Sequence, residues 1–299
     1  MKKIILFLAG CVLSVTQAWA SPLTVALPAR APLAKPFTLN IEGLPGDSVS
    51  VSYDGQHYEL TDQGSGQFAM ILGTTLDKKL IGKRQKVDIT LHRAGKAYLI
   101  HRTVLIDAAS YPEEHLKVEP KYVAPPKDQL KRIELQKKEV QQTFERANTL
   151  QQQAFTWPWK RSVPSEVITS VFGKRRVYNG TPRSFHAGTD FRASTGTPVR
   201  AVADGVVLLT QPGYFSGNVV YLGHGAGLVT AYMHLSRIDV KQGDALRAGD
   251  QLGLAGATGR VTGPHLHLGV ALNGKWIDPA TLFSPSTLPI QTKTVYDLK

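Results

Sequence analysis

The sequence has 299 residues, of which 42% are hydrophobic and 19% charged, a composition typical of a globular chain long enough for about two domains. Cys11 is its one cysteine, so a disulfide framework, a cysteine-rich zinc site and a zinc deaminase pattern are excluded. The formal net charge is +12, which favours anionic partners but indicates nothing about the fold.

The first 20 residues have the three parts of a secretion signal peptide. Lys2 and Lys3 form a basic start, residues 4–15 are mostly apolar, and Ala18-Trp-Ala20 is a cleavage site with small residues at both ends. We therefore expect export to the periplasm or cell envelope, with no transmembrane segment after cleavage. The alternative is a lipid anchor at Cys11, whose Leu-Ala-Gly-Cys setting resembles a lipoprotein processing box. Its very early position favours cleavage after Ala20.

The positive charge is unevenly distributed along the chain. Loss of Lys2 and Lys3 leaves a net charge of +10. Residues 156–285 carry 13 Lys and Arg against 7 Asp and Glu, whereas residues 22–155 carry 18 against 15. For an exported protein this predicts anionic wall or envelope polymers as partners, not nucleic acid. The alternative is a charge that serves solubility and has no dedicated partner.

Residues 21–108 predict a β-sandwich domain of immunoglobulin-like type, because short alternating segments recur at hairpin spacing. Asp54-Gly55 predicts a tight turn, and Ala94-Gly95 separates a second pair of strands. The alternating positions are Phe37, Leu39, Ile41, Val49, Val51, Tyr53, Tyr58, Leu60, Val87, Ile89 and Leu91. This domain carries no recognisable catalytic motif.

Residues 109–155 predict a proline-rich connector followed by one long helix. The prolines favour an extended path without regular structure; they are Pro112, Pro120, Pro125 and Pro126. Residues 128–154 lack Gly and Pro, and apolar residues recur there at spacings of three, four and seven: Leu130, Ile133, Val140, Phe144, Ala147 and Leu150. This stripe predicts either a lid that restrains the following domain or a helix that only buries the stripe against a neighbour. The two can coexist.

Residues 156–285 predict a second β domain, and residues 286–299 a C-terminal tail. Residues 199–209 predict two paired strands with a turn near Asp204-Gly205, and residues 218–222 predict another strand. Residues 229–235 alternate, which predicts an apolar face and a polar face. The apolar face has Val229, Ala231, Met233 and Leu235, and the polar face has Thr230, Tyr232 and His234.

Two stretches of this second domain concentrate histidine and aspartate: residues 185–191 and 262–268. In extended backbone, residues two apart share a face, so His186, Gly188 and Asp190 would point the same way, with His265 and His267 side by side. Two histidines and an aspartate can hold zinc and leave one position open for water, as catalytic sites do. His234 is either an acid–base partner of such a site or an ordinary histidine on the solvated side of a strand.

Residues 164–283 resemble the M23 family, the lysostaphin- and LytM-type zinc endopeptidases of bacterial cell walls. The matching stretches run in family order. They are residues 168–176, His186-Ala-Gly-Thr-Asp190, Gly196-Thr-Pro-Val199, Ala203-Asp-Gly-Val206, Gly217-Asn-Val-Val220, His224-Gly-Ala-Gly227, Tyr232-Met-His-Leu235, Gly256-Ala-Thr-Gly259 and Gly263-Pro-His-Leu-His267. Thr189 and Leu268 replace bulkier apolar residues common in the family, which are conservative changes in a strand.

Periodicity and resemblance together predict a mainly β chain: an N-terminal β-sandwich, a long connecting helix and a C-terminal antiparallel β domain with an open groove. The resemblance implies one Zn²⁺ per chain on His186, Asp190 and His267, with His234 and His265 as the catalytic pair. The implied function is hydrolysis of peptide crosslinks in peptidoglycan during cell-wall remodelling. Candidate substrate-binding residues flank the motifs; they are Tyr178, Arg176, Arg183 and Asn218.

Two other classes of function compete with this hypothesis. One is a non-catalytic wall-binding protein of the same fold that activates other wall hydrolases, and the intact set of five site residues argues against it. The other is a zinc-binding or zinc-sequestering protein, which leaves the resemblance outside the ligands unexplained.

Overall fold

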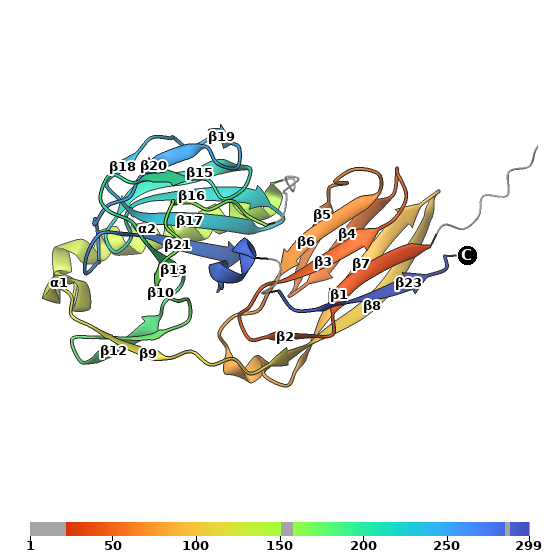
Figure 1. Ribbon diagram of the computed structural model, residues 1–299, viewed down its shortest axis with the longest axis horizontal. Helices are drawn as coiled ribbons and strands as arrows, with labels where there is room; N and C mark the ends of the chain where they lie inside the picture. Colours follow the sequence, from red (N-terminus) through yellow and green to blue (C-terminus); the bar gives the residue numbers. More distant parts are fainter. Residues whose placement is uncertain (1–21, 151–157, 285–287, 299) are drawn as a thin grey trace, which may run out of the picture.

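The computed structural model describes residues 22–150, 158–284 and 288–298, which form two β domains joined by a connector and a long helix (Figure 1). The predicted fold class, mainly β, is confirmed. The predicted signal peptide lies outside the described residues. Within the described ranges, no helix is long and apolar enough to cross a membrane.

The N-terminal domain is a sandwich of two sheets, with strand orders β23-β1-β3-β6 and β2-β8-β7-β4-β5. Side chains from both sheets share one apolar core, where the rings of Phe37 and Tyr53 meet edge-on at 6.2 Å. The predicted sandwich is therefore present, while its immunoglobulin-like type stays a prediction. Its elements are β1 (Leu23–Pro28), β2 (Arg30–Pro32), β3 (Phe37–Glu42), β4 (Ser48–Tyr53), β5 (Gln56–Leu60), β6 (Gln67–Leu72), the 3-10 turn η1 (Lys78–Leu80), β7 (Arg84–Arg93), β8 (Lys96–Asp107) and β23 (Gln291–Tyr296).

Both predicted hairpins of the sandwich are confirmed. Asp54 and Gly55 have φ of 52° and 75°, and Ala94 and Gly95 have φ of 48° and 76°. Two successive positive φ values define the type I′ turn, whose twist matches that of the flanking strands. Strands β4 and β5, and strands β7 and β8, pair antiparallel on either side of these turns.

The predicted C-terminal tail is in part a strand of the N-terminal sandwich. Strand β23 pairs antiparallel with β1 along its whole length, from Leu23↔Tyr296 to Pro28↔Gln291. The chain thus returns to its first domain after building the second (Figure 1). Close to this return, the carbonyl of Ala34 accepts from the Asp278 amide at 3.0 Å, and Lys35 forms an ion pair with Asp278. The two domains are therefore tied by backbone as well as side chains.

The connector contains more regular structure than its prolines predict. Strand β9 (Glu113–Leu116) pairs parallel with β11 (Arg175–Tyr178) of the C-terminal domain, and a short helix α1 (Pro120–Val123) follows. Proline fits here because it stands at the first position of α1, where its missing N–H costs no helical hydrogen bond. The predicted long helix is confirmed as α2 (Lys127–Thr149); Leu150 follows its last residue, and the predicted residues 151–154 lie outside the described part of the chain.

The C-terminal domain is built on a large antiparallel sheet of order β10-β13-β21-β17-β16-β15-β19, with β22 paired to β21. Two three-stranded sheets flank it, β12-β11-β9 and β14-β20-β18. The elements are β10 (Ile168–Ser170), β11 (Arg175–Tyr178), β12 (Thr181–Phe185), β13 (Thr189–Arg192), β14 (Pro198–Arg200), β15 (Gly205–Gly213), β16 (Gly217–Gly225), β17 (Leu228–Leu235), β18 (Arg237–Ile238), β19 (Ala245–Leu246), β20 (Gln251–Leu254), β21 (His265–Leu272), β22 (Lys275–Ile277) and the 3-10 turn η2 (Pro279–Phe283).

One predicted pairing in this domain is wrong. Residues 199–209 do not form a hairpin, because β14 pairs with β20 while β15 pairs with β16 and β19. The segment around Asp204 carries the chain from one sheet to the other. The strand predicted at residues 218–222 is confirmed as part of β16.

Helix α2 packs its apolar stripe on one face of the large sheet. Phe144 is the centre of this contact, with its ring edge-on to Tyr221 at 6.3 Å and to Trp276 at 5.7 Å. Ala147 is fully buried in the same cluster. Leu130, counted in the predicted stripe, is instead half exposed. The face that α2 covers is the face on which the histidines of β21 stand.

His224 of β16 is buried in the interior of the C-terminal domain. Its Nδ1 donates to the carbonyl of Asp204 at 2.6 Å, and its Nε2 lies 2.9 Å from Thr230 Oγ1. The ring of Trp159 packs on it at 5.8 Å. Burial lowers the pKa of His224 to about 4, because the imidazolium form loses its hydration. The histidine is therefore neutral in the folded protein at neutral pH.

Replacing His224 by glutamine should flatten the acid side of the pH–stability profile. The folded pKa of about 4 lies below the ordinary 6.5, so the unfolded chain binds the proton first and stability falls as pH drops through this window. Between pH 7 and pH 5 the wild type should lose about 2 kcal/mol of unfolding free energy that His224→Gln keeps. Denaturant unfolding across this pH range measures it, and parallel profiles would contradict the assignment.

Candidate metal centre and active site

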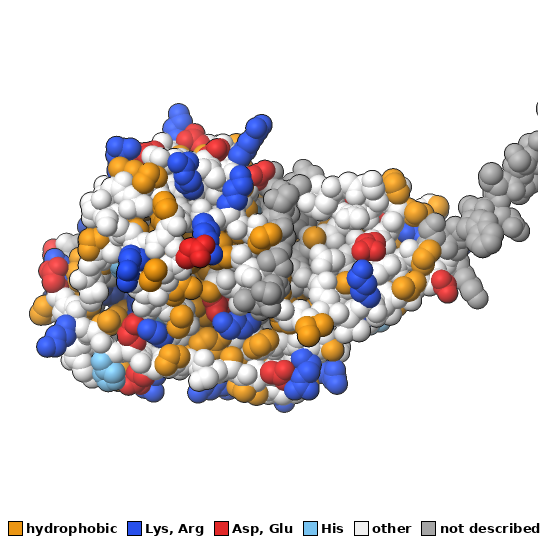
Figure 2. Space-filling view, in the orientation of Figure 1, with side chains coloured by type: hydrophobic (Ala, Val, Ile, Leu, Met, Phe, Trp, Pro, Cys, Tyr) orange, Lys and Arg blue, Asp and Glu red, His pale blue; other side chains and the backbone are white. Residues whose placement is uncertain are grey.

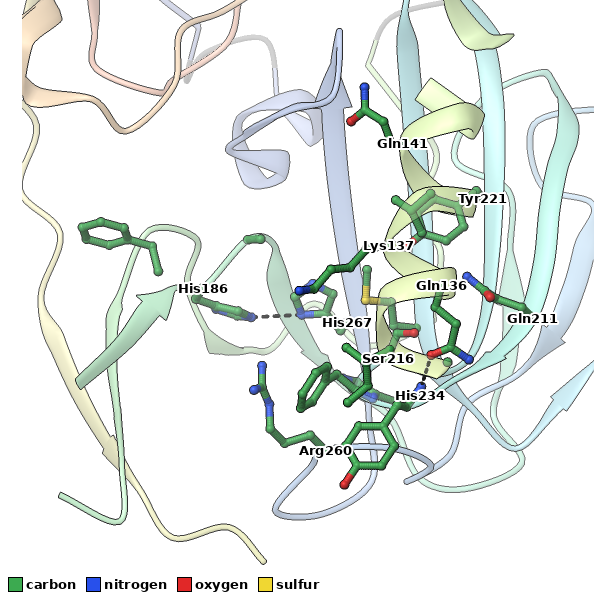
Figure 3. A pocket seen from close by; sticks show the side chains of 18 of the residues that line it. Gln136, Lys137, Gln141, His186, Gln211, Ser216, Tyr221, His234, Arg260 and His267 are labelled. Carbon is green, nitrogen blue, oxygen red and sulfur yellow. Dashed lines mark hydrogen bonds between the residues drawn. The ribbon is translucent and has the colours of Figure 1, made fainter. Parts of the chain in front are cut away.

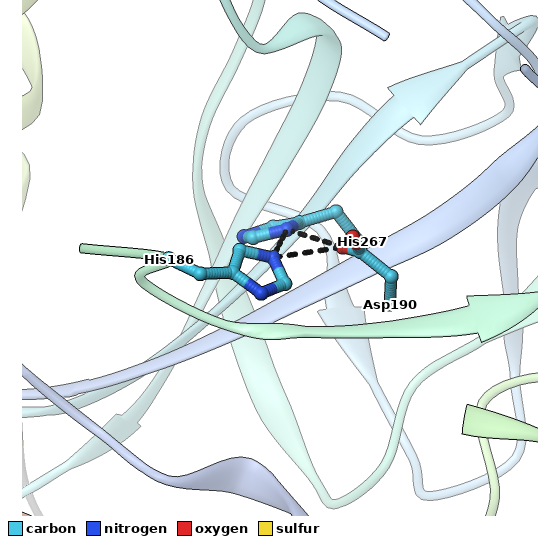
Figure 4. A group of neighbouring side chains, drawn as sticks. All are labelled: His186, Asp190 and His267. Atoms are coloured by element: carbon cyan, nitrogen blue, oxygen red, sulfur yellow. Dashed lines mark hydrogen bonds and ion pairs between the residues drawn. The ribbon is translucent and has the colours of Figure 1, made fainter. Parts of the chain in front are cut away.

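Three side chains of the C-terminal domain converge in the pattern of a metal site (Figure 4). His186 Nε2 lies 3.0 Å from Asp190 Oδ1 and 3.0 Å from His267 Nδ1, and His267 Nδ1 lies 2.8 Å from Asp190 Oδ1. All three residues are buried. Zinc bonds of about 2.0–2.1 Å in tetrahedral geometry separate their ligand atoms by about 3.3 Å, so a shift of a few tenths of an ångström admits the ion.

The protonation of these groups also fits a cation. His186 Nδ1 is 2.9 Å from the carbonyl oxygen of Val171, so this nitrogen carries the proton and Nε2 presents a lone pair. Asp190 Oδ1 is an acceptor as well. At most one proton, on His267 Nδ1, is then available for three mutually touching acceptor atoms. A metal ion satisfies all three, and an outer carbonyl that fixes the tautomer of a ligating histidine is the usual arrangement.

Strand pairing brings two of the three groups together directly. Asp190 of β13 stands opposite His267 of β21 in antiparallel register. His186 reaches them differently from our prediction, because β12 ends at Phe185 and β13 begins at Thr189, so His186 and Gly188 lie in the loop between the strands. The predicted strand position of His186 was therefore wrong, although the predicted convergence is present.

Gly188 is required by the close packing of that loop on the candidate ligand His267. A Cβ atom at this position would lie 2.4 Å from the carbonyl oxygen of Leu268 and 2.5 Å from His267 Nε2, well inside contact distance. The loop that carries His186 therefore passes directly over the ring of His267. Only glycine allows this approach.

Asp190 is held as a carboxylate by its neighbours. Burial opposes its ionisation, but the His186 and His267 rings, in the states where they carry a proton toward it, outweigh burial and hold the pKa of this carboxyl well below its usual range. Its second oxygen, Oδ2, accepts from Arg176 Nη2 at 3.0 Å. One oxygen thus faces the histidines and the other is fixed by the guanidinium.

His234 enters the site through a break in strand alternation. Its φ is +65°, an uncommon value for a residue other than glycine, and the β16–β17 register shifts at this point. Thr230 and Tyr232, predicted to share a polar face with it, are fully buried instead. Because the backbone turns at His234, this side chain lines the same cavity as His267, and the predicted face was wrong.

His234 and His265 stand as a pair beside the three candidate ligands. Their ring centroids are 4.9 Å apart, and His265 Nε2 lies 3.6 Å from Asp190 Oδ1. In each ring Nδ1 donates to a backbone carbonyl at 2.9 Å, of Thr258 for His234 and of Gly263 for His265. Burial, with the neighbouring histidines, holds the pKa of His234 well below its usual value. A neutral imidazole with a free Nε2 can accept a proton.

The site opens into a cavity of about 360 Å³ between the sheet and helix α2 (Figure 3). Gln136, Lys137 and Gln141 line it from the helix, opposite His186, His234 and His267. The groove is therefore bounded by α2 on one side, where we predicted an open one. Arg260, which was not predicted as a site residue, also lines the cavity, and its guanidinium lies over the rings of Tyr178 and Phe215 at 4.6 and 4.7 Å. Its position just after the Gly256–Gly259 motif was the available signal.

The four candidate substrate-binding residues lie in different places. Tyr178 and Arg176 belong to β11 and line the cavity, where Arg176 also supports Asp190. Asn218 belongs to β16 and uses its side-chain amide to bond the carbonyl of Leu235 at 3.0 Å, which secures the turn after His234. The side chain of Arg183 lies outside the described part of the structure.

Comparisons with known proteins agree with this geometry. Residues 184–279 match the model of peptidase family M23, and this segment includes the three candidate ligands and the paired histidines His234 and His265. The chain is 46% identical over 109 residues to peptidoglycan DD-endopeptidase ShyA of Vibrio cholerae, and 41% identical over 121 residues to DD-carboxypeptidase/endopeptidase Mpg of Neisseria meningitidis. These matches cover 36% and 40% of this chain, but 25% and 27% of the two relatives. The chain thus matches about a quarter of each curated relative.

A solved structure shares the wider architecture. The crystal structure of a protein assigned to peptidase M23 from Pseudomonas aeruginosa aligns with a TM-score of 0.59 at 28% identity, over 81% of this chain and 89% of that one. This alignment reaches well beyond residues 184–279. The C-terminal domain is therefore an M23 peptidase domain, and the predicted resemblance is confirmed.

Gly188→Ala should damage the metal site. The added methyl group must displace the ring of His267 or the backbone of Leu268, and overpacking of this kind costs about 1–3 kcal/mol. We expect purified Gly188→Ala to hold well under one metal ion per chain. Gly263→Ala is the matched control beside the same histidines, since a Cβ there meets nothing within 4 Å. Equal metal content in the two variants would show that the close approach is unimportant.

Proposed function

We propose that this protein is a zinc-dependent endopeptidase that hydrolyses peptide crosslinks of peptidoglycan. The observation that carries the proposal is the convergence of His186, Asp190 and His267 next to a second pair of histidines in a cavity. A structural zinc site would have four protein ligands, whereas three leave a position open toward the cavity. A zinc ion bound there would supply Lewis acidity toward a scissile carbonyl and a water molecule.

The chain's own groups supply the proton chemistry. In His234 and His265 a backbone carbonyl bonds Nδ1, which fixes the tautomer of the ring and leaves Nε2 facing the site. The ring that takes a proton from water then carries an Nε2–H, which can donate to the developing oxyanion and pass the proton to the leaving amine. Both rings have the same hydrogen-bond arrangement, so kinetic measurements on variants of each histidine would assign the individual roles.

The cavity favours a substrate that carries negative charge. Among the described residues that line it, Lys137, Arg176 and Arg260 are basic and none is acidic, and the charge of Arg176 is already paired with Asp190 and Glu114. A peptide with free carboxylates fits this lining, and the two relatives are named as a peptidoglycan DD-endopeptidase and a DD-carboxypeptidase/endopeptidase. Figure 2 shows one face of the molecule, and on it basic and acidic side chains are interspersed over both domains. A dedicated site for anionic wall polymers therefore stays a prediction.

Export to the periplasm or cell envelope is part of the proposal, supported by the predicted signal peptide and by the substrate. No observation on the described residues favours the non-catalytic activator, which would need neither the ligands nor the paired histidines.

Variants of the proposed zinc ligands and variants of the proposed catalytic histidines should lose different properties. His186→Ala, Asp190→Ala and His267→Ala should lose zinc, because two remaining ligands cannot hold the ion tightly. His234→Ala and His265→Ala should keep one zinc per chain and lose turnover of a crosslinked muropeptide by roughly 10²–10⁴. Metal analysis and product mass measure the two effects. Near-normal turnover in either of the last two variants would overturn the catalytic role.

We also propose that α2 restrains access to the site. Arg132 and Gln136 donate to the carbonyl of Pro212 at 2.6 and 3.0 Å, and the amide of Tyr214 donates to Gln136 Oε1 at 2.9 Å. These contacts tie the helix to the β15–β16 turn at the rim of the cavity. The interior stripe around Phe144 would still anchor the rest of the helix.

Loosening that tie should raise activity. Three hydrogen bonds are lost, and each shifts the balance by about 1 kcal/mol, so Arg132→Ala with Gln136→Ala should increase kcat/KM on a crosslinked muropeptide by up to about a hundredfold. The matched control is Leu135→Ala with Lys138→Ala, on the exposed side of the same helix. If the rim variant is no faster than this control, α2 serves only to stabilise the domain.

A further inference from the structure

The connector reaches the outer side of the metal site through strand β9. This strand pairs in parallel register with β11, so that Glu114 stands opposite Arg176 and Glu113 opposite Arg175. Successive strand residues face opposite ways, and only Glu114 of the two is directed inward: its side chain is 17% exposed, against 43% for Glu113. A carboxylate from outside the family-matched segment is therefore placed next to the ligand shell.

Glu114 continues a chain of alternating charges that begins at a metal ligand. Asp190 Oδ2 accepts from Arg176 Nη2 at 3.0 Å, and Arg176 Nε lies 3.4 Å from Glu114 Oε2, at ion-pair distance. Lys174 Nζ donates to Glu114 Oε1 at 2.7 Å. All four side chains are largely buried, so these charges act at short range with little screening by water.

A second contact leads from Glu114 toward another ligand. Ser170 Oγ lies 3.1 Å from both carboxylate oxygens of Glu114 and 3.4 Å from His186 Nδ1. Ser170 also stands opposite Asp190 in the β10–β13 pairing. Glu114 therefore touches the supporting groups of two of the three candidate ligands.

The charge of Glu114 matters because Arg176 and Lys174 are both cationic. Burial opposes the ionisation of Glu114, but Lys174, Arg176 and Ser170 outweigh it and lower the pKa of this carboxyl, so it is negative at neutral pH. Without that charge, Arg176 would be balanced by Asp190 alone. A guanidinium that draws more strongly on Asp190 leaves this carboxylate a poorer ligand for a cation.

We infer that Glu114 is a positioning residue for the metal centre, which orients Arg176 and limits its pull on Asp190. The inference rests on the proposed metal site and deepens it, since it makes metal affinity depend on the docked connector. Partners of metal ligands commonly change affinity by about 10–100-fold when they are replaced.

The test compares Glu114→Gln with Glu113→Gln in the full-length mature chain. Glutamine keeps the shape and removes the charge. Zinc affinity, measured by competition with a chromophoric chelator, should weaken by about tenfold or more in Glu114→Gln and stay unchanged in Glu113→Gln. The visible spectrum of the Co²⁺-loaded protein should shift in the first variant only. Glu114→Asp restores the charge and should recover most of the zinc affinity. This variant keeps the test decisive if Glu114→Gln folds poorly.

A double variant checks the route through Arg176. In an Arg176→Gln background, adding Glu114→Gln should weaken zinc binding by less than about twofold, because the group through which it acts is gone. Equal zinc affinity and equal Co²⁺ spectra in wild type and Glu114→Gln would overturn the inference while the proposed function stands. A wild-type chain that binds no zinc would instead remove the proposed function itself.

Discussion

Three buried acceptor atoms within 3.0 Å of one another are the constraint on which the rest of the C-terminal domain depends. Lone pairs on His186, Asp190 and His267 repel unless a cation or proton lies between them, so the fold must hold them together. It does so with directly opposed strands for Asp190 and His267, and with a loop whose glycine permits contact with a ligand ring. Arg176 fixes the remaining oxygen of the carboxylate.

Much of what surrounds this centre comes from outside the family-matched segment. Helix α2 covers the sheet and bounds the cavity, and β9 adds a strand and a carboxylate behind the ligands. Strand β23 then returns the chain to the N-terminal sandwich, which fixes both ends of the C-terminal domain to the same partner. The site is thus contacted by the connector and by α2, and the domain that carries it is tied to the sandwich.

Sequence patterns predicted what depends on local chemistry. The turns at Asp54-Gly55 and Ala94-Gly95 were predictable because two adjacent positive φ values need particular residues, and α2 because its stripe repeats within 23 residues. Features that depend on contacts between distant parts of the chain were not predictable in this way. The pairing of β23 with β1, the turn of His234 toward the cavity and the place of Glu114 behind Arg176 each arise from tertiary packing. The site residues were predictable from their spacing, and their division into ligands and a catalytic pair came from a family resemblance. Arg260 was marked only by its place after the Gly256–Gly259 motif, and the residues of α2 that line the cavity carried no signal of their own.

The most direct measurement of the central claim is digestion of purified peptidoglycan sacculi by the mature chain, with products identified by mass. The account predicts that crosslinked muropeptides are converted to uncrosslinked ones by cleavage of a peptide bond. Removal of the metal by a chelator should stop the reaction, and about one equivalent of zinc per chain should restore it. A muropeptide profile identical to that of the untreated sacculi, from protein shown to be folded and zinc-loaded, would contradict the account.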